Sequence, residues 1–479
     1  MNAPPGPLAA DAAAGSTAGA APLVAATLAA FVDRLAFADI PAEVARRAQH
    51  LILDGTGIAL ASTGFDFAHR TLTAMRGLAG EGATPVIGFP DRLPLRDAAL
   101  VNGVLVHGLD FDDTHLGGVV HATASVWPTV LAVGARHGAG GREALAAYVA
   151  GIEVAARLGA VAKGGFHQIG FHPTGLIGAF AAALAAGKLM GLTAEQLVTA
   201  QGIVLSLASG SLEFLEDGAW NKRLHPGWAA NAGITAASLA QQGFEGARRA
   251  YEGRFGLYAS HLHALHDPAN LALATAGLNE VWEVMQVAVK PFPACHFTHA
   301  CADAAIVLHG GGIDPAGIAR VRALVPAEVV KTVCEPVANK RRPANSYDAQ
   351  FSIPFIVAAA LLRGRFTLTE LTPDAIRDPA ILALADRVDY EIDPGSGFPT
   401  YYSGEVIAEM QDGSTRRHRE HQNRGCGDRP LSEADIRRKF DDNAARAVAT
   451  PRARRIAAAL LALDAAADLG AVAALLGGA

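Results

Sequence analysis

Charged side chains are scarce in this chain. Of its 479 residues only 18% are Asp, Glu, Lys or Arg, whereas 51% are hydrophobic. A chain this apolar must bury a large core, and it is too long for one ordinary core, so we expect two domains. Because the abundant Ala and Gly side chains are small, helices can approach closely, and we expect packed helices.

A basic excess is also absent. The formal net charge is −6, so the basic face of a nucleic-acid-binding protein is not expected. An anionic small-molecule substrate stays compatible with this total, because a few local cations decide how it binds.

Cysteines are few and show no disulfide framework. The four are Cys295, Cys301, Cys334 and Cys426. Such sparse spacing is typical of a reducing compartment, so we expect a cytoplasmic protein.

A membrane-targeting pattern is missing as well. The stretch from Ala12 to Val32 carries no charge, but it is mostly alanine with Gly, Ser, Thr and Pro, so it is weakly hydrophobic for a membrane span. No Lys or Arg precedes it, as a signal peptide would require. We expect no membrane association, a disordered tail over residues 1–20, and the first helix directly after it.

Several stretches imitate common catalytic or ligand-binding motifs but lack residues that those motifs require. His309-Gly-Gly-Gly imitates a lipase oxyanion loop, but the chain has no G-x-S-x-G nucleophile. Gly187-Lys188 lacks the rest of a phosphate-binding loop, and Gly55-Thr-Gly57 lacks the third glycine of a dinucleotide loop. A calcium-like start at Asp110 has His115 where glycine is required. Nucleotide-binding and common hydrolase classes are therefore excluded.

The chain is organised as helices around one mixed segment. Apolar runs at residues 145–156 and 176–190 predict buried helices, the second ended by Gly191, and Thr193 to Gln196 is a capping box. Strands are predicted at residues 321–326 and 387–393, and a hairpin turns at Asp412-Gly413. We expect a mainly α fold: a helical domain at residues 21–284 and 426–479, interrupted by a smaller α+β domain at 285–425.

A first polar motif is His107-Gly-Leu-Asp110-Phe-Asp-Asp-Thr114-His115, followed by His121. This stretch is too polar to belong to the hydrophobic core of so apolar a part of the chain. A solvated loop with helix-capping aspartates and a magnesium or zinc site are both open. The catalytic interpretation uses an imidazole and a carboxylate as proton carriers, with Thr114 donating a hydrogen bond.

A second motif is Gly170-Phe-His172-Pro173-Thr-Gly175, before a buried helix. Proline at the first helical position would leave His172 at the positive helix start, which lowers a histidine pKa and favours anionic ligands. A structural capping histidine is the alternative.

A third motif runs from Gly218 to Trp228 and contains Lys222, Arg223 and His225 between two tryptophans. Cations beside a rigid apolar wall suit carboxylate binding. The alternative is a solvated charged turn.

A fourth motif runs from Val287 to Cys301 and contains Lys290, Cys295 and two histidines. The spacing does not complete a tetrahedral zinc site. We expect Lys290 at the domain junction and a helix over residues 298–309.

Together, these four motifs in this order resemble the MmgE/PrpD family. The marks are Asn102-Gly103 before His107, Asp110-Phe-Asp-Asp-Thr114, Gly170-Phe-His172-Pro, Lys222-Arg-Leu-His225-Pro-Gly and Lys290-Pro-Phe-Pro-Ala-Cys295. The resemblance covers nearly the whole chain after the tail. It implies a large all-helical domain made from both chain ends, an inserted α+β lid domain, a homodimer, and an active site between the domains without metal or organic cofactor.

The resemblance also implies site residues. Asp110, Thr114, His121, His172, Lys222 and Lys290 fall in active-site positions of the family's cis-aconitate decarboxylase pattern. That pattern has histidine where this chain has Cys295 and tyrosine where it has Phe355. Cysteine at this position is similar to the dehydratase and epimerase branches.

We therefore expect a cofactor-independent, dehydratase-type lyase acting on a small di- or tricarboxylic acid such as a 2-methylcitrate-like substrate. Asp110, His121, His172 and Lys222 are the expected catalytic residues, and Thr114, Arg223, His225, Lys290 and Cys295 the expected substrate-binding residues. We expect the lower pKa and the base role at His172, and the higher pKa and acid role at His121. The alternatives are a dicarboxylate epimerase, a cis-aconitate-type decarboxylase, or a non-catalytic binding protein.

Overall fold

The computed structural model describes residues 22–80, 82–398, 400–427 and 429–478. The predicted tail over residues 1–20 lies outside the described residues. Helices dominate, and the strands form one four-stranded sheet and two small pairs. The predicted mainly α class is confirmed.

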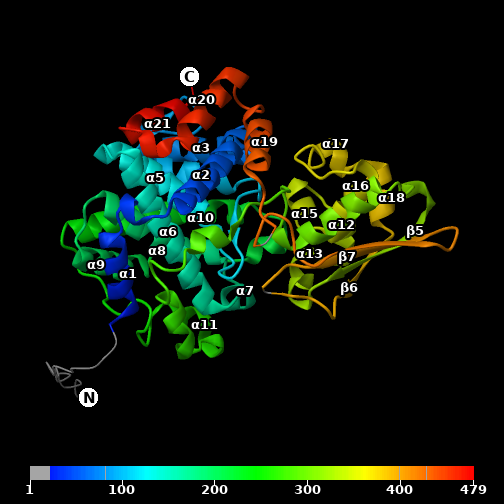
Figure 1. The fold of residues 1–479 in the computed structure, drawn as a ribbon, viewed down its shortest axis with the longest axis horizontal. Helices are drawn as coiled ribbons and strands as arrows, with labels where there is room; N and C mark the ends of the chain where they lie inside the picture. The colour runs from blue at the N-terminus through cyan, green and yellow to red at the C-terminus, as the bar shows by residue number, and fades with distance from the viewer. Residues whose placement is uncertain (1–21, 81, 399, 428, 479) are drawn as a thin grey trace, which may run out of the picture.

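The N-terminal part is built from helices, which Figure 1 shows gathered into one body. Its α-helices are α1 (Val24–Arg34), α2 (Ala42–Ser62), α3 (Asp66–Ala79), α4 (Leu95–His107), α5 (Thr123–His137), α6 (Gly141–Ala162), α7 (Gly165–Ile169), α8 (Pro173–Leu189), α9 (Ala194–Val204), α10 (Asn221–Gln241) and α11 (Leu257–Leu262). Short 3-10 helices are η1 (Phe37–Asp39), η2 (Glu213–Leu215), η3 (His263–Leu265), η4 (Pro268–Ala274) and η5 (Glu283–Gln286). Two-residue strands are β1 (Thr84–Pro85), β2 (Arg92–Leu93), β3 (Thr114–His115) and β4 (Val287–Ala288).

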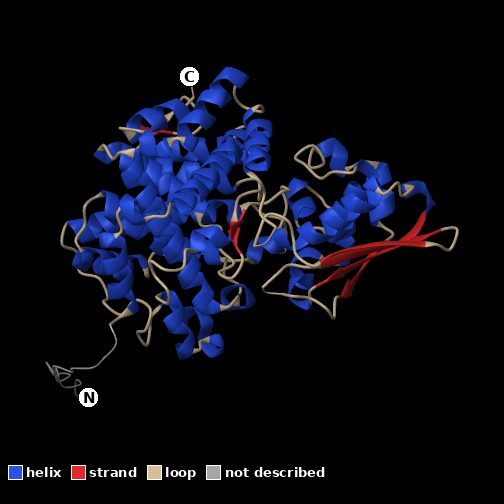
Figure 2. Cartoon of the chain, viewed as in Figure 1, coloured by secondary structure: helices blue, strands red, loops and turns tan. Residues whose placement is uncertain are grey.

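A second group of elements surrounds the sheet, which Figure 2 shows as red strands apart from the main helical body. Its helices are η6 (His296–Thr298), α12 (His299–Gly310), η7 (Pro315–Gly317), η8 (Ala327–Val329), α13 (Val330–Val333), α14 (Val337–Arg341), α15 (Ser346–Gln350), α16 (Ile353–Arg363), α17 (Pro373–Ile376) and α18 (Pro379–Ala385). Its strands are β5 (Ile318–Val325), β6 (Val388–Ile392), β7 (Gly404–Met410) and β8 (Thr415–Glu420), in the order β6-β5-β7-β8. β5 is parallel to β6 and antiparallel to β7, and β7 and β8 form the hairpin predicted at Asp412-Gly413.

The chain then returns to the first body. The last helices are α19 (Glu433–Ala444), α20 (Thr450–Leu461), η9 (Leu463–Ala465) and α21 (Leu469–Leu476). α19 packs on α2, and α21 packs on α5, so elements far apart in sequence share one core. In Figure 1 these red C-terminal helices lie beside the blue N-terminal ones.

The sequence signals that predict helix starts are confirmed at two helices. His172 caps α8 with Pro173 at the first helical position, and Thr193 and Gln196 form the predicted capping box at the start of α9. Among the described residues, α6 is the one helix long and apolar enough to cross a membrane, but 94% of its most apolar window is buried inside the protein. It is a core helix.

Helices α4 and α10 cross at two glycines. A Cβ added at Gly103 would lie 2.6 Å from the Cα of Gly227, and one added at Gly227 would lie 2.3 Å from the carbonyl oxygen of Leu100. The backbones therefore touch at this point, and the contact fixes α10, which carries Lys222, against α4, which leads into Asp110.

We expect Gly103→Ala to lower the free energy of unfolding by about 1–3 kcal/mol, because the added methyl forces the two backbones apart. Urea unfolding would measure the change. Gly77→Ala is the matched control, since its Cβ would meet no atom within 4 Å in α3; it should be neutral or stabilising. Equal stability of Gly103→Ala and the parent would refute the close crossing.

Candidate active site

A cavity forms where the four polar motifs meet. Its walls include seven of the nine residues expected to act on substrate: Asp110, Thr114, His121, His172, Lys222, Lys290 and Cys295. They come from four segments spread over residues 110–295, so the fold alone assembles them. The pairing of β3 with β4 helps, because Thr114 lies opposite Ala288, two residues before Lys290.

The centre of the cavity is an aspartate held by two lysines. One oxygen of Asp110, Oδ1, accepts hydrogen bonds from Lys222 Nζ at 2.7 Å and from Lys290 Nζ at 2.8 Å. Lys290 also donates to the Asp110 backbone carbonyl at 3.0 Å. Burial alone would raise the pKa of Asp110, but the two ammonium groups outweigh it and hold that pKa well below its usual range. The pKa of Lys290 is raised, since Asp110 and Asp112 outweigh its burial.

This arrangement leaves hydrogen-bonding capacity unused. An ammonium group has three N–H donors, and Lys222 uses one of them and Lys290 two in the part of the chain described by the structure. The second carboxylate oxygen of Asp110, Oδ2, is buried and has no partner among the described residues. The remaining ammonium donors are therefore available to a substrate oxyanion.

His121 is oriented as a proton acceptor. Its Nδ1 lies 2.7 Å from the carbonyl oxygen of Asp113 and 3.2 Å from Thr114 Oγ1. A carbonyl oxygen only accepts, so Nδ1 carries the hydrogen and Nε2 keeps a free lone pair. Burial lowers the pKa of His121 well below its usual value, although Asp112 opposes the shift. Burial therefore outweighs the nearby carboxylate, and the predicted order of the His121 and His172 pKa values stays a prediction because both are lowered.

His172 lies at the start of α8 as expected, and a second histidine supports it. The Nδ1 atoms of His172 and His225 are 3.1 Å apart, so one ring donates to the other. Burial, His225 and Lys222 lower the pKa of His172 well below its usual value. His225 itself does not line the cavity, so its contact with His172 replaces the substrate-binding role expected for it.

A possible metal-ligand set lies beside the cavity. Ligand atoms of His107, Asp112 and His121 are all within 4.8 Å of one another. His107 Nδ1 is hydrogen-bonded to Asp112 at 2.7 Å, and His121 Nδ1 to the Asp113 carbonyl. Burial would raise the pKa of Asp112, but His107 and His121 lower it to about 2. His107 Nε2 and Asp112 Oδ1 are buried and have no hydrogen-bond partner among the described residues.

The remaining walls are largely apolar and were not predicted. They comprise Val119, His167, Leu212, Phe214, Leu215, His296, Phe297, Thr332, Phe351 and Tyr402. Most come from loops or from the sheet-containing part, and no local motif marks them. Burial raises the pKa of the Cys295 thiol to about 11, so it stays protonated at neutral pH.

Arg223 is the other expected residue that the cavity does not include. It follows Lys222 in the first turn of α10, and consecutive helical residues point about 100° apart. Its guanidinium lies 4.5 Å from the ring centres of Phe67 and Tyr347, on a different surface cleft.

Comparisons with known proteins find relatives over most of the chain. Residues 26–266 match the MmgE/PrpD N-terminal domain, and residues 292–465 match the MmgE/PrpD C-terminal domain. The mouse cis-aconitate decarboxylase is 30% identical over 84% of this chain and 83% of its own length, and the human one is 30% identical over 84% of each. A cis-aconitate decarboxylase-like protein, oryM, of Aspergillus oryzae is 26% identical over 95% of this chain and 97% of its own length.

We expect the free energy of unfolding to fall as the pH drops below about 6.5. Burial lowers the pKa of five histidines at or beside the cavity: His121, His167, His172, His225 and His296. In the unfolded chain each has its ordinary pKa near 6.5, so the unfolded state binds more protons in acid. Each histidine then removes up to about 1.4 kcal/mol per pH unit.

Urea midpoints between pH 8 and pH 5 test this expectation. His225→Phe should make the decline shallower, whereas His137→Gln, at an exposed position, should leave it unchanged. A midpoint independent of pH over this range would contradict the neutral, buried state of these histidines.

We expect Lys290→Met to destabilise the fold by about 3–5 kcal/mol, because it leaves a buried carboxylate with one cation fewer. Lys290 is fully buried and Asp110 is 1% exposed. Calorimetry of the variant and of the double variant with Asp110→Asn measures the effect. The double variant should recover part of the loss, and exposed Lys163→Met should cost nothing. A harmless Lys290→Met would show that the pair is not important for stability.

Proposed function

The chain belongs to the MmgE/PrpD family, and from that premise we propose that it is a dehydratase-type lyase acting on a small di- or tricarboxylic acid. The observation that carries the proposal is the pair of lysines on Asp110 facing a neutral histidine with a free Nε2. A cation pair binds a carboxylate, and a neutral imidazole removes a proton from the carbon next to it.

The proposed reaction starts with the substrate carboxylate on the unused donors of Lys222 and Lys290. His121 Nε2 takes the proton from the adjacent carbon, and the negative charge that develops on the carboxylate is stabilised by the two ammonium groups. The electron pair forms the carbon–carbon double bond as the hydroxyl leaves. Lys222 gives that hydroxyl a proton, so the leaving group is water.

This assignment differs from the roles expected from the sequence, which are base for His172 and acid for His121. His121 with hydrogen on Nδ1 is a base rather than an acid at neutral pH, and the lysine ammonium is the proton donor. His172, supported by His225, lines the same cavity and would hold a substrate oxygen through its remaining ring nitrogen. The sheet-containing part would act as the lid that excludes water.

Decarboxylation is the second candidate, and two observations favour it. Relatives that match most of the chain are cis-aconitate decarboxylases. The cavity also has an apolar wall that includes Phe214, Phe297 and Phe351. A carboxylate pressed against such a wall loses its hydration, which favours its departure as CO2.

We also propose a homodimer. Leu224, Trp228 and Leu239 of α10 are 36–44% exposed, and at 100° per residue they fall on one face of the helix. Large exposed apolar side chains on one helix face are typical of a protein interface. A second copy of the chain is the occupant that the family resemblance implies.

The test is proton NMR of the enzyme with hydroxy-tricarboxylates and with cis-aconitate in deuterated water. Dehydration gives a new olefinic signal, decarboxylation removes a carboxylate carbon, and epimerisation gives deuterium exchange without net loss. The reaction should persist after exhaustive chelation, as expected for a metal-independent enzyme. Turnover that disappears on chelation and returns with a metal would overturn the proposed mechanism.

Variants connect the reaction to the residues. Lys222→Ala should lower kcat/KM by about a hundredfold, near 3 kcal/mol of transition-state stabilisation, and His121→Gln should lower mainly kcat. Exposed His137→Gln is the control and should keep full activity. Binding of these acids without turnover by the parent enzyme would instead support a non-catalytic binding protein.

A further inference from the structure

Arg223 is a buried cation that forms no ion pair with any residue that the structure describes. Arg223 is 6% exposed, and its Nε atom is buried and has no hydrogen-bond partner among the described residues. No carboxylate, carbonyl or hydroxyl accepts from its other nitrogens in the described ranges of the chain. Burial lowers the pKa of its guanidinium. A guanidinium carries five N–H donors. The one on Nε is buried and unpaired, which is unfavourable, whereas the two terminal nitrogens open onto the cleft that Arg223 lines.

Three aromatic rings surround this guanidinium but cannot satisfy it. The centres of the Phe67 and Tyr347 rings are each 4.5 Å from its central carbon, and that of Trp220 is 5.5 Å away. The rings hold the cation by their π faces and fix its orientation. They supply no oxygen to its N–H groups, so the guanidinium keeps its donors for a partner that enters from the cleft.

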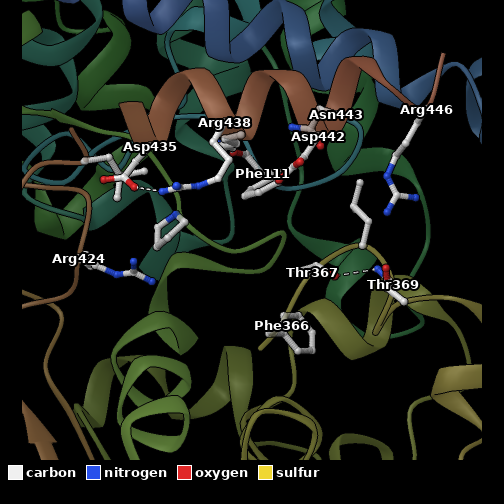
Figure 3. A pocket seen from close by; sticks show the side chains of 14 residues that line it. Phe111, Phe366, Thr367, Thr369, Arg424, Asp435, Arg438, Asp442, Asn443 and Arg446 are labelled. Carbon is white, nitrogen blue, oxygen red and sulfur yellow. Dashed lines mark hydrogen bonds and ion pairs between the residues drawn. The ribbon is translucent and has the colours of Figure 1, made fainter. Parts of the chain in front are cut away.

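The cleft beside Arg223 carries a positive charge, which is complementary to an anion. It is also lined by Arg377 and Arg446, which have no ion-pair partner among the residues that the structure describes. Its one acidic residue, Asp66, has a side chain 81% exposed and lies 3.9 Å from Arg70. Arg446 also lines a neighbouring cleft beneath α19, which Figure 3 shows with Phe111, Arg424 and Arg438. Three arginines therefore face one cleft whose only acidic wall residue is the exposed Asp66, so the cleft carries a net positive charge.

This cleft is separate from the catalytic cavity, because the two have no wall residue in common. Its walls come from both parts of the chain: Phe67 and Trp220 from the helical part, Asn345 and Thr372 from the sheet-containing part. We infer that the cleft is a second anion site, in which Arg223 binds the oxyanion of a small carboxylate or phosphate compound. Its occupant bridges the lid and the helical part.

Calorimetric titration of the full-length protein with inorganic phosphate and, separately, with citrate tests the inference and distinguishes the two oxyanions. We expect at least one to bind, with Arg223→Gln raising Kd tenfold or more. Lys222→Ala, which alters only the catalytic cavity, should leave that Kd within twofold. Arg254→Gln is the matched control, because Arg254 is also stacked on an aromatic ring, at 4.5 Å from Phe255, but is exposed.

Several results would overturn the inference. Equal affinity in Arg223→Gln would mean an adventitious ion only, and loss of binding in Lys222→Ala alone would place the anion in the catalytic cavity. No binding of either probe up to about 10 mM would exclude a useful site. A change of oligomeric state in Arg223→Gln, measured by light scattering, would mean that a carboxylate of a second copy is the partner. If Arg223→Gln does not fold, the exposed variants Arg377→Gln and Arg446→Gln should each weaken binding several-fold, and unchanged affinity in both would refute the site.

Discussion

One buried carboxylate organises the functional part of this protein. Asp110 is reached by Lys222 from α10 and by Lys290 from the segment that leads into the sheet-containing part. Three charges in so apolar a protein are tolerable only when they compensate one another. The loop after α4, the start of α10 and the chain beyond β4 must therefore be placed together, and the glycine crossing of α4 and α10 brings two of them close.

Much of this could be predicted from the sequence, since local chemistry controls it. His172 at a helix start follows from the proline after it, and Lys222 and Lys290 stand out as cations in apolar surroundings. The hairpin at Asp412-Gly413 follows from turn chemistry. Recognition of the family added the joint placement of these motifs, which spacing alone does not provide.

The remaining features depend on tertiary packing. Phe351 and Tyr402 reach the cavity only because the sheet-containing part folds against the helices, and no local pattern marks them. Arg223 lines a different cleft from Lys222, because consecutive residues of a helix point in different directions, and the sequence does not distinguish two neighbouring cations. The sequence also does not show that burial, rather than the nearest carboxylate, dominates the pKa of His121.

The residues of the cavity wall differ in chemistry according to the part of the chain that supplies them. Asp110, His121, His172 and Lys222 come from the helical part, and Lys290 joins them from the segment that leads out of it. The segment after residue 290 contributes His296 and a second group of wall residues: Cys295, Thr332, Phe351 and Tyr402. Substitutions in the second group can reshape the space around the substrate without disturbing the charges that perform the chemistry. Such an architecture lets descendants of one ancestor diversify in substrate while inheriting the same proton-transfer apparatus.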